Sequence, residues 1–161
     1  MAMLELPHSP GCLVCGRNNP HGLRLFLHVD EETGHVRCDF IPRPEHVGFE
    51  GIIHGGVLAT VMDEAMVWAA SWRGRRFCVC GELTVRFRQS VHVGQSLIVF
   101  AQVDYSRPRL IETSGKIMDA SNSLIATANG KYVPVAPDQH KAFVATLMEE
   151  EATSQALGML R

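Results

Sequence analysis

The residues best suited to chemistry lie in one stretch, in which His54 is followed by Gly55 and Gly56 and, nine positions after the histidine, by Asp63. Two glycines at a helix start leave backbone N–H groups open to a ligand, at the positive end of the helix dipole. Such groups can hold a carbonyl oxygen as it becomes an oxyanion, and His54 can exchange a hydrogen bond at the same place. Asp63 is a carboxylate on an otherwise apolar helix, where desolvation favours a proton-accepting role.

Each of these residues also has a purely structural interpretation. The glycines can serve close packing of a helix against a sheet, and His54 can cap the helix or lie satisfied in the core. One of Asp63 and Glu64 can be a solvated or salt-bridged surface group. Because Glu64 lies about 100° around the helix from Asp63, the two cannot face one point, so Glu64 is given a supporting role at most. The combination is more specific than any single member.

The elements that must position this segment follow from the spacing of apolar residues. Helical spacing runs over residues 55–72 and is apolar around most of the circumference, so this helix must be enclosed on several sides. Alternation typical of strands occurs twice before the helix and four times after it. These strands are expected at residues 23–29, 36–40, 82–88, 96–103, 110–118 and 124–133. Short connections favour antiparallel neighbours, which predicts an α+β fold: one curved antiparallel sheet of about six strands wrapped around the central helix.

The two ends of the chain differ from its middle. Residues 1–21 are rich in Pro, Gly, Asn and Cys and are expected to form an irregular lead-in. Residues 22–135 are expected to form the domain. Residues 136–161 predict a C-terminal tail with a short peripheral helix that Asp138 caps and that frays.

Composition excludes several classes of function. The 161 residues fit one domain, and 15 Lys+Arg against 17 Asp+Glu give a formal net charge of −2, without the basic footprint of a nucleic-acid binder. The apolar stretch over 57–70 is broken by polar residues, so no membrane-spanning helix and no membrane partner are expected. We see no secretory signal in residues 1–10, and five scattered cysteines do not suggest a disulfide framework. A reduced, cytoplasmic protein is the expectation.

Three motifs extend the pattern beyond the helix. They are CLVCG from residue 12 followed by NPHGL from residue 19, GIIHGGVLATVMDEAM over residues 51–66, and ELTVRF over residues 82–87. With them, the chain resembles the hotdog-fold acyl-CoA thioesterases, in the phenylacetic-acid-degradation (PaaI-like) branch, over about residues 12–134.

The resemblance implies roles for the central motif. In that family the acid nine residues after the motif histidine is the catalytic carboxylate, which corresponds to Asp63. The glycine after the histidine, Gly55, polarises the thioester carbonyl through its N–H, and His54 helps to orient the substrate. The implied reaction is hydrolysis of an acyl-CoA to free acid and CoA, with no cofactor and with Asp63 as general base or as nucleophile through a transient anhydride.

Further residues are candidates for substrate binding, the arginines among them for the phosphates of CoA. They are Gly56, Glu64, Cys80, Thr84, Arg86, Arg88 and Arg107, with Arg109 and Lys116 as further cations near strand ends. Charges on an outer sheet face are more often simply solvated.

Two departures from the family pattern stand out. Many relatives carry Asn six residues before the motif histidine, where this chain has Gly48. A Ser or Thr hydroxyl often lies where this chain has Cys80, and a thiol is a weaker hydrogen-bond donor. Thr84 can substitute for that hydroxyl only if it lies on the right face of its strand.

Helix geometry predicts an assembly. Gly55 and Asp63 are eight residues apart, about 12 Å along a helix axis, so one helix cannot place both within about 3 Å of one reacting carbonyl. Two antiparallel helices across a two-fold axis can do so. We therefore expect a homodimer with shared sites, in agreement with the dimeric sites of the family, and dimers that can pair into tetramers.

Other functions remain open at this stage. The same fold can bind or sense acyl-CoA without turnover, or hydrate acyl-CoA double bonds with a different arrangement of Asp and His. Cys12 and Cys15 with His8 and His21 could form a zinc knuckle, but one C-x-x-C without a second pair is weak evidence, so no metal is expected.

Overall fold

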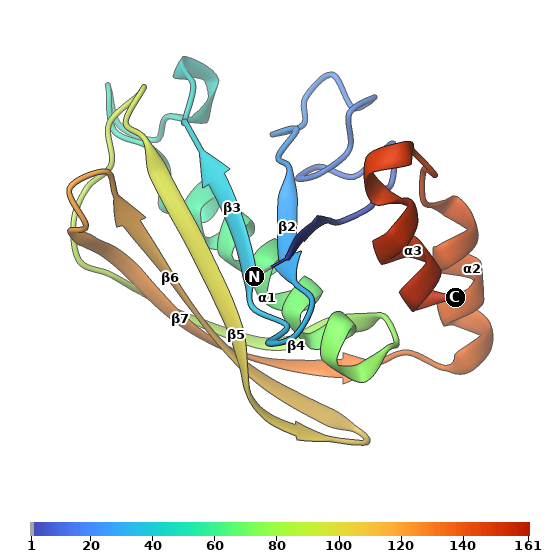
Figure 1. Cartoon of the computed structure of the whole chain (residues 1–161). Coiled ribbons are helices and arrows are strands. Elements are labelled where there is room, and N and C mark those ends of the chain that lie inside the picture. The colour runs from blue at the N-terminus through green and yellow to red at the C-terminus, as the bar shows by residue number, and fades with distance from the viewer. Residues whose placement is uncertain (1) are drawn as a thin grey trace.

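A long helix, α1 (Gly55–Gly74), lies along one face of a curved, seven-stranded antiparallel sheet in the computed structural model, which describes residues 2–161 (Figure 1). The strands are β1 (Met3–Glu5), β2 (Leu27–Asp30), β3 (Val36–Phe40), β4 (Cys78–Phe87), β5 (Leu97–Arg107), β6 (Leu110–Asp119) and β7 (Leu124–Pro134). Their order across the sheet is β1-β2-β3-β5-β6-β7-β4. This arrangement confirms the predicted fold, a curved antiparallel sheet around one central helix.

The helix packs deep against the sheet because two strands present glycines beneath it. A Cβ atom at Gly115 of β6 would lie 3.0 Å from the Met66 sulfur, and one at Gly130 of β7 would lie 3.0 Å from Met66 Cε. A larger residue at either position would force the Met66 side chain to move. Met62, Ala65 and Met66 are fully buried as a result.

The N-terminal region differs from the prediction in two ways. Residues 1–21 are not wholly irregular, because β1 pairs with β2 as a seventh strand. The strand predicted from Leu23 starts at Leu27 instead. Arg24 adopts a left-handed backbone conformation (φ 55°), and the N–H groups of Leu23 and Leu25 donate to carbonyls of residues 13 and 14, so this stretch joins the N-terminal loop.

The C-terminal tail holds two helices rather than one that frays. These are α2 (Pro137–Thr146), which has no buried residue, and α3 (Ser154–Leu160), which buries Leu157 and Leu160. Ala136 occupies the N-cap of α2, while Asp138 lies in its first turn. Figure 1 shows α3 beside the N-terminal segment, and α3 contacts β1. The tail therefore packs against the start of the chain.

Strand β4 forms one edge of the sheet and runs antiparallel to α1. The Cys78 N–H donates to Ser71 Oγ near the helix end (3.1 Å), whereas Phe87 contacts Gly55 at the helix start. Only one side of β4 is paired, by β7, so its other side presents free backbone groups. Among residues 2–161 no helix has the length and apolarity to cross a membrane.

Candidate active site

The start of α1 leaves one backbone donor free. His54 is the N-cap residue, and its Nδ1 accepts a hydrogen bond from the Gly56 N–H (2.8 Å). The Gly55 N–H finds no acceptor within residues 2–161. The structural interpretation of His54 as a helix cap is thus correct. The cap engages the backbone N–H of Gly56, which was a candidate for substrate binding. Gly55 is left as the donor at the positive end of the helix.

Two glycines, Gly48 and Gly56, leave space for the His54 ring between them. A Cβ atom at Gly56 would lie 2.9 Å from His54 Nδ1, and one at Gly48 would lie 3.1 Å from His54 Cδ2. Because Nδ1 accepts, the neutral ring carries its proton on Nε2, which remains available as a donor. At Gly48, the position compared above with an Asn of many family members, the imidazole lies in the space that a side chain would need.

Asp63, the central candidate, is held by a phenol. Tyr132 of β7 donates a hydrogen bond to Asp63 Oδ1 (2.8 Å), and Tyr132 itself is fully buried. Burial, and after it the charge of Asp63, raises the pKa of Tyr132, so the phenol keeps its proton and donates. Asp63 is only half-buried, so its second oxygen can still receive a ligand.

Cys80 completes this cluster. Desolvation, followed by the charge of the nearby Asp63, raises the pKa of the Cys80 thiol. Cys80 therefore lies beside the carboxylate, where the family pattern has a hydroxyl.

Thr84 and the arginines do not join the cluster. Leu83 and Val85 pack against the core, so Thr84, between them, lies on the opposite face of β4, as does Arg86. Arg107 lies at the end of β5 and donates to the Tyr105 hydroxyl (2.6 Å). Of the proposed cations, only Arg88 lines a hollow next to Gly55.

That hollow has a volume of about 400 Å³ and adjoins the free N–H of Gly55. Its lining combines apolar rings with one guanidinium: Phe49, Leu58, Phe87 and Arg88 are among the lining residues. Phe49 is 83% exposed and Phe87 is 49% exposed, which is far above the usual level for such side chains. A partner or a ligand would cover them.

Glu64 faces away from this cluster. Its Oε1 accepts from Trp68 Nε1 (3.2 Å) and lies 3.9 Å from the Cys12 sulfur on the N-terminal loop. Desolvation, and after it the charge of Cys12, raises the pKa of Glu64 to about 7. Glu64 is thus no part of a site at Asp63.

Sequence reasoning missed Tyr132. The inward positions of β7 before it are Ala126, Ala128 and Gly130, which are too small or too apolar to reach a carboxylate. Tyr132 is the first inward residue of that strand with a polar tip, and this alternation was the available signal.

The comparisons with known proteins agree with this geometry. The family model described as Thioesterase superfamily matches residues 50–126, a segment that includes His54, Gly55 and Asp63. This match confirms the predicted resemblance over the segment that it covers.

Solved structures show the same fold at low sequence identity. A structure titled thioesterase superfamily protein RHA08564 has a TM-score of 0.71 and 23% identity over 77% of this chain, and the match spans only 60% of that protein. The PaaI protein of E. coli has a TM-score of 0.61 and 20% sequence identity, and the match covers 64% of this chain and 74% of that protein. A Streptococcus mutans protein bound to acetyl CoA has a TM-score of 0.63 and 17% sequence identity, and the match covers 67% of this chain and 86% of that protein. The hotdog fold is thereby confirmed.

Proposed function

We propose that this hotdog chain of the thioesterase superfamily hydrolyses acyl-CoA thioesters, with Asp63 as the catalytic carboxylate and the Gly55 N–H as the oxyanion donor. The observation that carries the proposal is the hydrogen bond from Tyr132 to Asp63 Oδ1 (2.8 Å), because it orients a half-buried carboxylate on an apolar helix. A carboxylate fixed in this way can accept a proton from water or attack a carbonyl carbon.

Each site takes groups from two copies of the chain. Gly55 and Asp63 are about 12 Å apart along α1, too far to act on one carbonyl. Strand β4 lies at the edge of the sheet and runs antiparallel to α1, so a two-fold axis at this edge sets the start of one α1 against the middle of the other. The exposed rings of Phe49 and Phe87 beside Gly55 are then covered by the partner.

The reaction proceeds by addition and elimination. As general base, Asp63 takes a proton from a water whose oxygen attacks the thioester carbon, and the Gly55 N–H stabilises the oxyanion that forms. Collapse of the tetrahedral intermediate breaks the C–S bond, and the CoA thiolate leaves and is protonated. As nucleophile, Asp63 attacks the same carbon directly, expels the thiolate and is released when water hydrolyses the anhydride.

CoA as the thiol component is supported by a structural neighbour, since the Streptococcus mutans protein is bound to acetyl CoA. In this chain Arg88 is the cation beside the hollow at Gly55, which makes it the first candidate for a CoA phosphate. Arg86 and Arg107 do not line that hollow.

Thiol release over a panel of aliphatic and aromatic acyl-CoAs tests the proposal. We expect turnover by the protein, loss of about 10²–10⁴-fold in kcat for Asp63→Ala, and unchanged turnover for Asp138→Asn, an exposed acid on α2. Circular dichroism of each variant confirms that it is folded. CoA binding without any thiol release would instead favour the non-catalytic binding function.

A further inference from the structure

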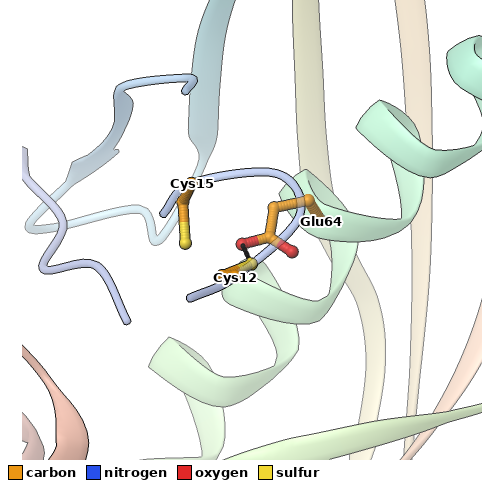
Figure 2. A group of neighbouring side chains, drawn as sticks. All are labelled: Cys12, Cys15 and Glu64. Atoms are coloured by element: carbon orange, nitrogen blue, oxygen red, sulfur yellow. Dashed lines mark hydrogen bonds between the residues drawn. The ribbon is translucent and has the colours of Figure 1, made fainter. Parts of the chain in front are cut away.

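Three side chains that the proposed reaction does not use come together on the other flank of α1. Cys12 and Cys15 from the N-terminal loop lie beside Glu64 (Figure 2). One ligand atom from each residue, two sulfurs and one carboxylate oxygen, lies within 4.8 Å of the other two. The Cys12 sulfur and Glu64 Oε1 are 3.9 Å apart. The cluster joins residues that are 52 positions apart in the sequence.

The loop is built to hold Cys12 in place. The Gly16 N–H donates to the Cys12 carbonyl (3.0 Å), which closes a tight turn, and a Cβ atom at Gly16 would lie 2.4 Å from that same oxygen. The Val14 N–H donates to the Cys12 sulfur (3.4 Å). These contacts hold the Cys12 sulfur next to Cys15 and Glu64, within 4.8 Å of a ligand atom of each.

The cluster lacks a positive partner. Within residues 2–161 no Lys or Arg forms an ion pair with Glu64, whose Oε1 accepts from Trp68 Nε1 and contacts the Cys12 sulfur. A carboxylate taken out of water is unfavourable without a cation or enough hydrogen-bond donors. Two thiol sulfurs and one carboxylate are a donor set that suits zinc, since sulfur ligands favour soft or borderline cations over magnesium or calcium.

The distances also suit zinc. With Zn–S bonds of about 2.3 Å and a Zn–O bond of about 2.1 Å, tetrahedral angles require about 3.6 Å between a sulfur and an oxygen and about 3.8 Å between two sulfurs. The separation of 3.9 Å between Cys12 Sγ and Glu64 Oε1 is within a few tenths of that value. We propose that Cys12, Cys15 and Glu64 bind one zinc ion, with the fourth position open to water. His8 and His21 are not members of the cluster.

Such a site ties the N-terminal loop to the central helix. Metal affinity that exists only in the folded chain adds to the free energy of folding. The proposed zinc takes no part in hydrolysis at Asp63, because Glu64 faces away from the Tyr132–Asp63 pair. The site is independent of hydrolysis, so its test needs no substrate.

Titration of reduced, metal-free protein with Co²⁺ tests the proposal, because thiolate–cobalt bonds give strong near-ultraviolet absorption. We expect one Co²⁺ per chain, displaced by Zn²⁺. Cys12→Ser and Cys15→Ser should each weaken binding at least 100-fold, and Glu64→Gln should weaken it at least tenfold. The matched control Cys80→Ser, outside the cluster, should bind Co²⁺ as the unmodified chain does.

Two results would overturn the zinc site. One is the reduced protein taking up no stoichiometric Co²⁺ while titrating as five free thiols, because then the dithiol is intact and does not bind metal. The other is Co²⁺ binding that persists in Cys12→Ser. If a cysteine variant does not fold, the thermal midpoint decides: Zn²⁺ should raise it in the unmodified chain and raise it by less in Glu64→Gln at the same Zn²⁺ concentration. Equal increases in the two proteins would overturn the site.

Discussion

Asp63 and Glu64 are adjacent in the sequence, but the two flanks of α1 give them different surroundings. Asp63 faces β7, where the Tyr132 hydroxyl donates to it and part of the carboxylate stays open. Glu64 faces the N-terminal loop, where it meets two thiols and an indole, and desolvation raises its pKa to about 7. The helix supplies the same kind of side chain to both flanks. What packs against each flank decides whether the acid can act on a substrate or bind an ion.

After Asp63→Ala itself, the largest expected effect comes from removing the hydrogen-bond donor on the Asp63 flank. Tyr132→Phe should lower kcat by about 10–100-fold, since a hydrogen bond to a charged group contributes about 1.5–3 kcal/mol. KM should change much less, because the phenol contacts Asp63 rather than the acyl chain. Steady-state kinetics with the best acyl-CoA measures this, and Tyr105→Phe on the exposed part of β5 is the control. An unchanged kcat would mean that Tyr132 does not orient the carboxylate.

Cys80→Ser, on the same flank, should raise kcat, whereas Tyr132→Phe should lower it. A hydroxyl is a stronger hydrogen-bond donor than a thiol and would stand beside Asp63 and Tyr132. We expect an increase of about two- to fivefold in kcat from this better donor, equivalent to roughly 0.4–1 kcal/mol. Thr84→Ala, on the opposite face of β4, should leave kcat unchanged. A decrease for Cys80→Ser would show that the thiol itself is required.

Glu64→Gln tests the other flank. The amide keeps the shape of the side chain and can still accept from Trp68 Nε1, while the cluster loses its carboxylate. We expect hydrolysis to stay within about threefold of the unmodified chain, against about 10²–10⁴-fold for Asp63→Ala. The two variants are compared in one thiol-release assay at saturating substrate. Equal losses would remove the functional distinction between the two acids.

The smallest expected effect is on thermal stability and concerns a third acid, Asp30. It shows how hydrogen-bond donors change the pKa of a buried carboxylate. Asp30 Oδ1 accepts from the Thr33 N–H (2.8 Å), the Thr33 hydroxyl (2.9 Å) and the Glu32 N–H (3.1 Å), and the first of these lowers its pKa most. A lowered pKa stabilises the fold above the unfolded value of about 4, and this contribution is lost as the pH falls through the folded value.

Asp30→Asn should therefore lower the thermal midpoint by roughly 2–4 °C at pH 7 and by less near pH 3. Thermal melts at both pH values measure the difference, with Asp138→Asn as the control. A deficit that is the same at both pH values would show that the charge of Asp30 contributes nothing to the turn.

Much of the fold could be predicted because its signals are local. The apolar circumference of α1 and the alternation of the strands after it depend on near neighbours in the sequence. The N-terminal strand could not be predicted, since three residues at Met3–Glu5 have no visible period. Arg24 breaks a strand that the alternation favours, because Leu23 and Leu25 pair with the loop that carries Cys12 and Cys15.

The site was harder to predict from the sequence than the fold. Cys80 and Thr84 are four residues apart and would share a face in a regular strand, but the register shifts between Cys80 and Glu82. This bulge turns Cys80 toward Asp63 and leaves Thr84 on the far face. One irregular residue, Gly81, thus decides which side chain reaches the carboxylate. The approach of Cys12 to Glu64 was equally hidden, because it depends on the path of a whole loop.

The packing of α3 on β1 has a consequence for how the chain is made. The two elements lie about 150 residues apart, and Arg17 adds ion pairs to Glu5 next to β1 and to Glu150 ahead of α3. At 5–20 residues per second, a ribosome finishes α3 roughly 8–30 s after β1. During that interval β1 has no cover, and an uncovered edge strand is open to pairing with other nascent chains.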